Sequence, residues 1–469
     1  MFVNDSSPSL RLTHFSVQGL FGEFNHSIPL CKDEHITALI GPNGMGKTVC
    51  LRLINSLFHH TWMTFQTTEF KKIEFQFNDK SVIQIDKPDN VDGETDVSDT
   101  MGLRFVTLIP GDKPDTWFPR SRNLSGFRRP LEQYLPFLTR IGPRSYVHDN
   151  TRQIMSIQEI LANYADRLPE SILRAYSEPP SAKLEKIISQ IDCHLIETQR
   201  LLVFEADEFR KSQGSTLAIS HKANVLKEII ANDLAVYAST SQSLDRSFPK
   251  RVLQEWKILP SENIRENLAK LDDIRKGLMD AGILDPEVDD ALPPLEVTDN
   301  AIAAVLSVYI QDSEQKLNVL TKLKQRIQLF INLINSRFFP KKISVDKKKG
   351  FSVERQENSN TQLQDNSPPC VFDVPLEKLS SGEQHQLVLF FELLFELKKN
   401  ALILIDEPEL SLHVAWQKQF IPDLLRIIRL NKFNVLLATH SPQLIGEWED
   451  IVVELGKVDL IEGREDHRK

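Results

Sequence analysis

A chain of 469 residues, 41% hydrophobic and 26% charged, can bury a large core and has room for two or three structural units, so its composition excludes a disordered or fibrous protein. The net charge of -9 argues against a protein that covers its whole surface with nucleic acid, although it leaves room for a local basic patch. No apolar run approaches the length that crosses a bilayer, and the N-terminus lacks the features of a signal peptide. We therefore expect a cytoplasmic protein with no membrane partner.

The first 110 residues are predicted to be mainly strands. LRLTHFSVQGLFGEFNHSIPL alternates apolar and polar residues around a glycine bend, and HITALI predicts a short buried strand that runs into a glycine loop. After this loop VCLRLINSLFHHTW has helical spacing, and FKKIEFQFNDKSVIQID predicts a hairpin. Residues 1–110 are therefore predicted to form the first lobe of an α/β domain.

The middle of the chain is predicted to be an insertion into this domain. Residues 111–200 turn Pro-rich and then helical, so we expect a mostly helical insertion and the end of the first lobe. Residues 201–340 have helical periodicity in almost every window, which predicts a coiled-coil-like arm. An arginine cluster in the first insertion is as consistent with a solvated face as with phosphate contact. It consists of Arg120, Arg122, Arg128 and Arg129.

The last part of the chain, residues 341–469, is predicted to be the second lobe. A hairpin (KKISVDKKKGFSVERQ) and a polar linker come first. Helix, strand, helix and strand then follow one another, ending in NVLLATH. This alternation is typical of an α/β unit.

The segment GPNGMGKT at residues 41–48 matches G-x-x-x-x-G-K-[ST] between a predicted strand and a predicted helix. In such a loop the glycines turn backbone N–H groups toward phosphate oxygens, Lys47 bridges the β- and γ-phosphates of ATP, and Thr48 can bind Mg²⁺. A glycine-rich turn that precedes Lys-Thr by chance is the alternative, but the flanking elements disfavour it. The predicted nucleotide contacts of this loop are Asn43, Gly44, Gly46, Lys47 and Thr48.

A second motif, ALILIDEPELSLH, is an apolar strand that ends in two carboxylates. A carboxylate at the tip of a buried strand suits Mg²⁺, which prefers oxygen ligands, so we assign Asp406 to the metal. Glu407 points differently and is the candidate general base that polarises the attacking water. Alone, such a pair is usually a solvated turn, and only its combination with the glycine loop favours catalysis.

A third motif, LSSGEQ, directly precedes a helical pattern. Ser380 or Ser381, together with Gly382, can open a helix whose free N–H groups face an anion. Taken alone, this motif predicts only a capped helix. The order of glycine loop, long insertion, LSSGEQ, Asp-Glu strand and a strand that ends in His440 changes that interpretation.

This order resembles the ABC-type ATPase superfamily over residues 8–60 and 370–450. The resemblance implies an α/β fold, an ABC-type P-loop ATPase head with a mixed β-sheet and a long α-helical insertion. It also implies a head-to-tail dimer that sandwiches ATP, with Ser381 and Gly382 contacting the nucleotide of the other copy. His440 matches the switch histidine that senses the γ-phosphate, and Gln199 is the candidate for the glutamine that links nucleotide to arm.

Two branches of the superfamily are similar to this chain. SSGEQ and the separation of more than three hundred residues between Thr48 and Ser381 resemble the chromosome-maintenance and DNA-repair branch (SMC and RecF). DEPELSLH is similar to the overcoming-lysogenisation-defect (OLD) group and to ATPase subunits of antiphage systems such as Septu and PARIS, in which Glu409 and His413 match motif positions. OLD proteins continue into a nuclease domain, for which the segment after His440 leaves no space, so we expect no nuclease activity in this chain.

Two functional hypotheses follow from these resemblances. In the first, the chain is the ATP-hydrolysing subunit of a bacterial antiphage complex, assembles as dimers or higher oligomers with ATP and Mg²⁺, and controls a separate nuclease effector. In the second, it is a DNA-repair ATPase that binds nucleic acid directly through the helical arm and the arginines near Arg120.

Overall fold

In the computed structural model, the chain forms two compact units. The first unit contains the described residues up to 196 and those from 397 onward, and the second contains the described residues between them. The described residues are 10–30, 35–87, 102–120, 131–135, 137–142, 145–149, 152–164, 168, 178–196, 202–203, 216–254, 260–285, 300–356 and 371–456.

The first unit contains a six-stranded antiparallel sheet in the order β2-β1-β4-β5-β6-β7. Alternate side chains face the core, as in β4, where Ile73, Phe75 and Phe77 are buried and the residues between them are half-exposed. The predicted strands and hairpin of the first 110 residues are thereby confirmed. The bounds are β1 (Leu12–Leu20), β2 (Phe24–Pro29), β4 (Lys72–Phe77), β5 (Val82–Asp86), β6 (Arg104–Leu108) and β7 (Asp115–Trp117).

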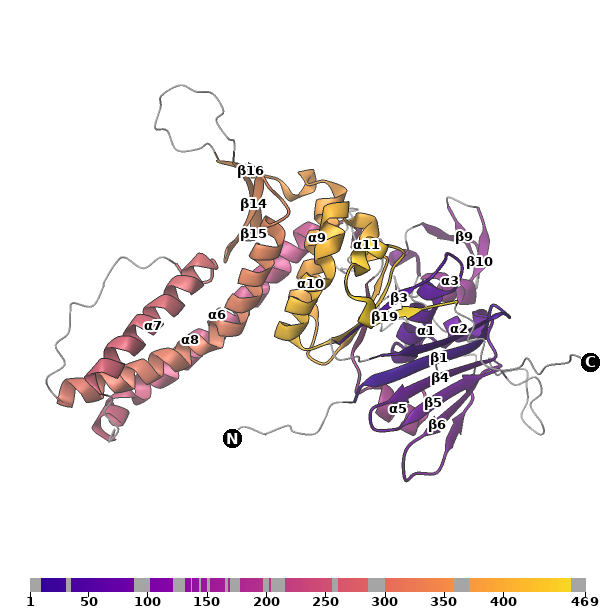
Figure 1. The fold of residues 1–469 in the computed structure, drawn as a ribbon, viewed down its shortest axis with the longest axis horizontal. Helices are drawn as coiled ribbons and strands as arrows, with labels where there is room; N and C mark the ends of the chain where they lie inside the picture. The colour runs from indigo at the N-terminus through magenta and orange to yellow at the C-terminus, as the bar shows by residue number, and fades with distance from the viewer. Residues whose placement is uncertain are drawn as a thin grey trace, which may run out of the picture. The chain divides into compact units, whose positions relative to one another are not determined.

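A five-stranded parallel sheet, in the order β11-β17-β18-β3-β19, forms the second layer of the first unit (Figure 1). Its central strands β17 and β18 are buried over their whole length and mostly apolar, as expected for parallel strands covered on both faces. In such sheets ligands bind at the carboxyl ends of the strands. The bounds are β3 (Ile36–Ile40), β11 (Cys193–Ile196), β17 (Leu402–Asp406), β18 (Asn434–Ala438) and β19 (Val452–Glu454).

Helices connect and cover these strands. Helix α1 follows β3, and α10 joins β17 to β18, both at positions where the sequence predicts helices. A buried Trp62 at the start of α2 packs edge-on against Phe105 and Trp117 and donates its indole N–H to the Glu178 carbonyl at 2.9 Å. The bounds are α1 (Lys47–Phe58), α2 (Trp62–Thr67), α3 (Ile157–Tyr164), α5 (Ala182–Ile188), α10 (Val414–Asn431) and α11 (Pro442–Ile445).

A small three-stranded antiparallel sheet, β10-β9-β8, lies within residues 131–168 and has its own apolar cluster with α3. The sequence interpretation, which expected mostly helix between residues 111 and 200, did not anticipate these strands. Each is only three or four residues long, too short for alternation to be visible in the sequence. The bounds are β8 (Leu138–Arg140), β9 (Ser145–His148) and β10 (Ile154–Ser156).

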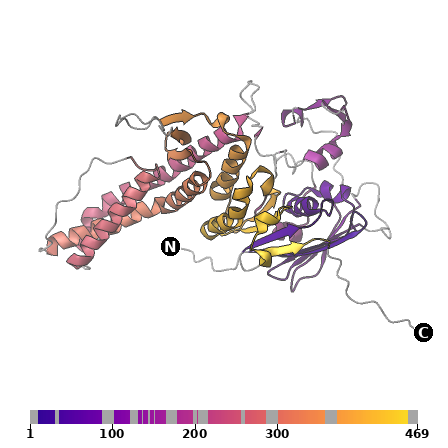
Figure 2. The same ribbon diagram turned by 45° about the horizontal axis from the view of Figure 1, so that its top comes forward.

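The second unit is dominated by three long helices that run side by side (Figures 1 and 2). They are α6 (Ala218–Gln254), α7 (Ser261–Asp280) and α8 (Asn300–Asn335), which agrees with the helical periodicity of the sequence. Ion pairs join α6 to α8: Arg251 contacts Asp312, and the Lys316 ammonium lies 2.6 Å from an Asp245 carboxylate oxygen.

The second unit also contains a two-stranded sheet of β12 (Leu202–Val203) and β13 (Thr216–Leu217), a three-stranded antiparallel sheet and helix α9 (Ser381–Phe391). Helix α9 continues as a π-helical turn over Glu392–Glu396. Lys222, near the start of α6, is buried and pairs with Glu392 at 3.0 Å and with Glu396 at 2.7 Å. These pairs fix α6 to the end of α9. The strands of the three-stranded sheet are β14 (Lys341–Asp346), β15 (Gly350–Gln356) and β16 (Val371–Val374). Within the described ranges, no helix of either unit combines the length and apolar character needed to cross a bilayer.

Candidate functional site

The glycine loop of the first unit lies between β3 and α1, at the carboxyl edge of the parallel sheet. Lys47 is the first residue of α1, and its side chain folds back over the loop: Nζ donates to the carbonyl oxygens of Gly41 at 2.7 Å and Pro42 at 3.0 Å. Lys47 is 5% exposed. Burial lowers the pKa of Lys47, and the charges of Glu407, Asp406 and Glu409 oppose this shift.

Two glycines of the loop have left-handed backbones, at φ +85° for Gly44 and φ +83° for Gly46. A Cβ on Gly46 would lie 2.5 Å from the Cδ2 atom of buried Leu20, whereas a Cβ on Gly44 would meet nothing within 4 Å. Gly46 therefore permits close packing of the loop against β1, in addition to the backbone turn that both glycines permit.

We expect Gly46→Ala to destabilise the nucleotide-free protein by about 3 kcal/mol, because left-handed strain adds to the clash with Leu20. Gly44→Ala is the matched control, since it carries the same strain without the clash, and should cost about 1 kcal/mol. Thermal unfolding without nucleotide measures both. Equal shifts in melting temperature would show that the contact between Gly46 and Leu20 has no energetic role.

Thr48 and Asp406 meet at the same edge of the sheet, where the Thr48 hydroxyl donates to Asp406 Oδ1 at 3.1 Å. Asp406 ends β17 and is 9% exposed. Burial raises the pKa of Asp406, while the hydrogen bond from Thr48 lowers it. A hydroxyl and a carboxylate are both hard oxygen ligands, so this pair fits Mg²⁺, as predicted from the sequence.

Glu407 and His440 extend this cluster. Glu407 has a left-handed backbone with φ +45°, which is uncommon for a non-glycine residue, and its N–H donates to the Ala438 carbonyl at 2.9 Å. His440 follows β18, the neighbour of β17, so its ring lies beside the Glu407 carboxylate, with Nε2 and Oε1 3.5 Å apart. Lys47 Nζ lies 3.3 Å from His440 Nδ1. Since an ammonium can only donate, Nδ1 accepts, which leaves Nε2 to carry its hydrogen toward Glu407.

The predicted site residues therefore separate into groups. Lys47, Thr48, Asp406, Glu407 and His440 come together in the first unit. Asn43, Gly44 and Gly46 are in the adjoining loop. Ser381 and Gly382 belong to the second unit. Gln199 lies outside the described residues, as do Arg122, Arg128 and Arg129.

In the second unit, Ser380 rather than Ser381 caps α9. A capping box is present, because the Ser380 hydroxyl accepts from the Glu383 N–H while the Glu383 carboxylate accepts from the Ser380 N–H at 2.8 Å. Lys341 contacts both carboxylate oxygens of Glu383, at 2.9 and 2.8 Å. Burial of Glu383 favours its neutral form, but these hydrogen bonds outweigh it and hold the pKa of Glu383 below its usual value. Ser381 and Gly382 therefore occupy the first turn of a firmly capped helix, where N–H groups lack partners within the helix.

His413 has a structural role. It is the N-cap of α10, and its ring accepts from the Ala415 N–H at 3.3 Å and lies against Trp416. Glu409, in contrast, reaches the site: its Oε1 accepts from the backbone N–H of His440 at 2.6 Å. The sequence identified Glu409 as a candidate only through its motif position, and nothing in the local pattern indicated this partner.

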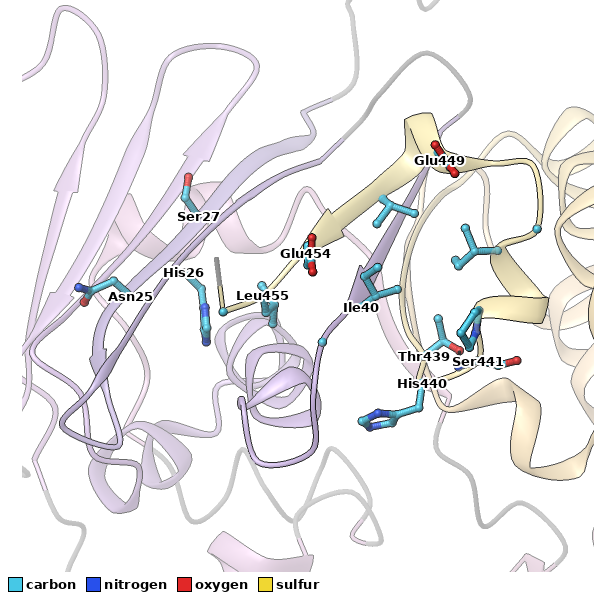
Figure 3. A pocket seen from close by; sticks show the side chains of 16 residues that line it. Asn25, His26, Ser27, Ile40, Thr439, His440, Ser441, Glu449, Glu454 and Leu455 are labelled. Atoms are coloured by element: carbon cyan, nitrogen blue, oxygen red, sulfur yellow. Dashed lines mark hydrogen bonds between the residues drawn. The ribbon is translucent and has the colours of Figure 1, made fainter. Parts of the chain in front are cut away.

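A cavity of about 880 Å³ opens beside the glycine loop in the first unit. Figure 3 shows His440 and Thr439 on one side of it, and His26 and Leu455 on another. His26 also holds the loop, since its Nε2 lies 2.8 Å from the Met45 carbonyl oxygen. Polar side chains of β2 and of the segment after β18 therefore line this cavity, which extends to Gly41 at the start of the glycine loop.

A P-loop between β3 and α1, with carboxylates at the end of β17 in the same parallel sheet, defines a P-loop nucleotide-binding protein. The sequence pattern of the AAA ATPase domain family matches residues 21–445, and the chain belongs to this family. Proteins of the family bind nucleotide, typically with Mg²⁺, and generally hydrolyse ATP. The predicted α/β class with a long helical insertion is confirmed.

Among solved structures, the chain is similar to three SMC head domains, each at 10% sequence identity. The head with an extended coiled coil bound to the C-terminal domain of ScpA, from Pyrococcus furiosus, has a TM-score of 0.32, covering 95% of this chain and 93% of that one. The head from Thermotoga maritima has a TM-score of 0.29, and the match covers 93% of this chain and 91% of that one. The head with a coiled coil and joint from Pyrococcus yayanosii has a TM-score of 0.30, and the match covers 95% of each chain. No curated protein matches the chain.

Proposed function

We propose that this chain hydrolyses ATP in an active site that a second copy completes. The observation that carries the proposal is the grouping of Lys47, Asp406, Glu407 and His440 at one sheet edge, with the ring of His440 between the lysine and the glutamate. A cation, a metal-type carboxylate and a second carboxylate near a histidine are the parts that phosphoryl transfer to water requires.

Each residue has a separate task in the proposed reaction. The loop N–H groups and Lys47 bind and orient the triphosphate, and Lys47 would exchange its contacts with Gly41 and Pro42 for phosphate oxygens. Glu407 orients the attacking water and takes its proton. The Nε2 hydrogen of His440 is available to Glu407 or to a phosphate oxygen. Mg²⁺, when held by Thr48 and Asp406, neutralises phosphate charge.

The second copy would contribute Ser381 and Gly382 to the active site. Their position in the first turn of the capped helix α9 suits anion binding, and the resemblance to ABC-type ATPases assigns this contact to the opposite chain. The specific turnover should therefore rise with protein concentration until the dimer is saturated, which a dilution series of ATPase assays measures. A specific turnover that stays constant in a protein shown to be monomeric under assay conditions would contradict the shared site.

For the biological role, we propose the ATPase subunit of an antiphage complex that controls a separate nuclease. The support is DEPELSLH, which resembles the ATPase subunits of such systems, together with the long arm formed by α6, α7 and α8. Purification from the native host should yield a small nuclease with this chain, and loss of the chain should raise phage plating efficiency. A chain that purifies alone and leaves phage infection unaffected would count against this role.

A DNA-repair ATPase that binds nucleic acid directly is the second candidate. The exposed side chain of Arg120, next to the other arginines of its cluster in the sequence, is the observation that favours it. The isolated protein should then bind DNA with an affinity that falls steeply with salt, and replacing Arg128 and Arg129 by alanine should reduce the slope. Fluorescence anisotropy of a labelled duplex at several salt concentrations distinguishes the two roles.

A further inference from the structure

Glu409 links two loops that are far apart in sequence. It lies in the 3₁₀ turn Pro408–Ser411, which follows β17, whereas His440 follows β18. Because β17 and β18 are parallel neighbours, with Asp406 opposite Ala438, the two loops leave the sheet side by side. The Glu409 carboxylate crosses this gap and accepts from the His440 N–H at 2.6 Å, a short, charge-assisted hydrogen bond.

This hydrogen bond holds the backbone of His440, from which the imidazole ring extends. On one side, Thr439 is fully buried and its N–H donates to the Leu39 carbonyl at 3.0 Å. On the other side, the Ser441 hydroxyl donates to the side chain of Gln417 at 2.6 Å. Between these two, the His440 side chain is 32% exposed, and its ring lies between Lys47 and Glu407.

The two oxygens of the Glu409 carboxylate differ. Oε1 accepts from His440, whereas Oε2 is buried and has no hydrogen-bond partner among the described residues. Replacing Oε2 by an amide nitrogen therefore removes no hydrogen bond that the described residues make. Shortening the side chain by one carbon, in contrast, withdraws Oε1 from the His440 N–H and leaves that donor unsatisfied.

We propose that Glu409 is a positioning residue that holds the backbone of His440 and thereby sets the ring between Lys47 and Glu407. The length of the Glu409 side chain, which brings Oε1 to the His440 N–H, matters more than its negative charge. This inference rests on the proposed ATP hydrolysis and adds to it a contact that fixes the histidine on which the geometry of the site depends.

Three variants of Glu409 separate reach from charge. Glu409→Gln keeps the reach and should retain kcat within about threefold. Glu409→Asp keeps the charge but loses the reach, and should lower kcat on the order of 10- to 100-fold with little change in KM, since misplacing a catalytic group by about 1 Å has such effects. Glu409→Ala should behave like Glu409→Asp. If the Glu409→Asp variant retains ATP turnover while the Glu409→Gln variant loses it, the proposal is overturned.

A double-mutant cycle shows whether Glu409 acts through His440. In a His440→Ala background, Glu409→Asp should change kcat by about twofold or less, because the group that it positions is gone. The same loss of kcat in both backgrounds would show that Glu409 acts independently of His440, and would overturn the proposal.

A measurement without nucleotide keeps this inference separate from the proposed function. In protein labelled with ¹⁵N-histidine, the His440 amide, assigned from the peak that His440→Ala removes, should resonate downfield because of its short bond to a carboxylate. Glu409→Asp should shift it upfield more than the control Gln417→Ala, which removes the hydrogen bonds of Gln417 with Ser441 and with the Leu412 carbonyl but leaves the contact between Glu409 and His440. If Glu409→Asp leaves the chemical shift of the His440 amide unchanged, the contact between Glu409 and His440 is contradicted. If the parent protein shows this contact but never hydrolyses ATP, only the proposed function is contradicted.

Discussion

Lys47→Ala is expected to lower the affinity for ATP by about 100-fold or more and to abolish turnover. The ammonium is the cation of the glycine loop, and its loss removes at least one charge-assisted contact to the triphosphate, worth about 3 kcal/mol. Because Lys47 is buried beneath its own loop, alanine also removes the hydrogen bonds to the Gly41 and Pro42 carbonyls. Binding of a fluorescent ATP analogue and phosphate release measure the two effects.

The control for Lys47→Ala is Lys418→Ala, which removes a lysine from α10 in the same unit and should leave both measurements unchanged. Melting temperatures of both variants without nucleotide exclude unfolding as the cause. Unchanged ATP binding by a folded Lys47→Ala protein would contradict the assignment of the loop as the phosphate site.

Glu407→Gln is expected to bind ATP with near-parental affinity and to lower kcat by about 1000-fold, because a general base contributes about 10²- to 10⁴-fold. The amide keeps the shape of the side chain and can still accept from the Nε2 hydrogen of His440, so the geometry around the ring should persist. What it cannot do is take a proton from water. Single-turnover hydrolysis, measured at saturating ATP and Mg²⁺, separates this step from binding.

Asp423→Asn, in α10 of the same unit, is the control that also replaces a carboxylate by an amide. It should hydrolyse ATP at the parental rate. Parental hydrolysis by Glu407→Gln would instead show that another group takes the proton, and the role of Glu407 would then be limited to orienting His440.

The sequence was sufficient to place the local parts of the site. The strand before the glycine loop, the helix that starts at Lys47 and the carboxylates at the end of an apolar strand are each visible as a continuous pattern. Periodicity also predicted the long helices α6 and α8, since their apolar faces repeat over many turns.

What the sequence could not supply were contacts that depend on strand order. The carboxyl ends of β17, β18 and β3 meet because these strands are neighbours in the sheet, and no local pattern encodes that order. The hydrogen bonds that the His440 N–H donates to Glu409 and that Lys47 donates to the His440 ring follow from this strand order. His413 was a candidate through motif position alone, and the sequence did not indicate that its side chain caps α10.

The mass of Glu407→Gln protein in ATP and Mg²⁺, measured by native mass spectrometry, tests the shared active site most directly. We predict two chains with two bound nucleotides, and a single chain with one nucleotide when Ser381→Arg is added to the same background. A Glu407→Gln protein that binds ATP but stays a single chain at every concentration would contradict it.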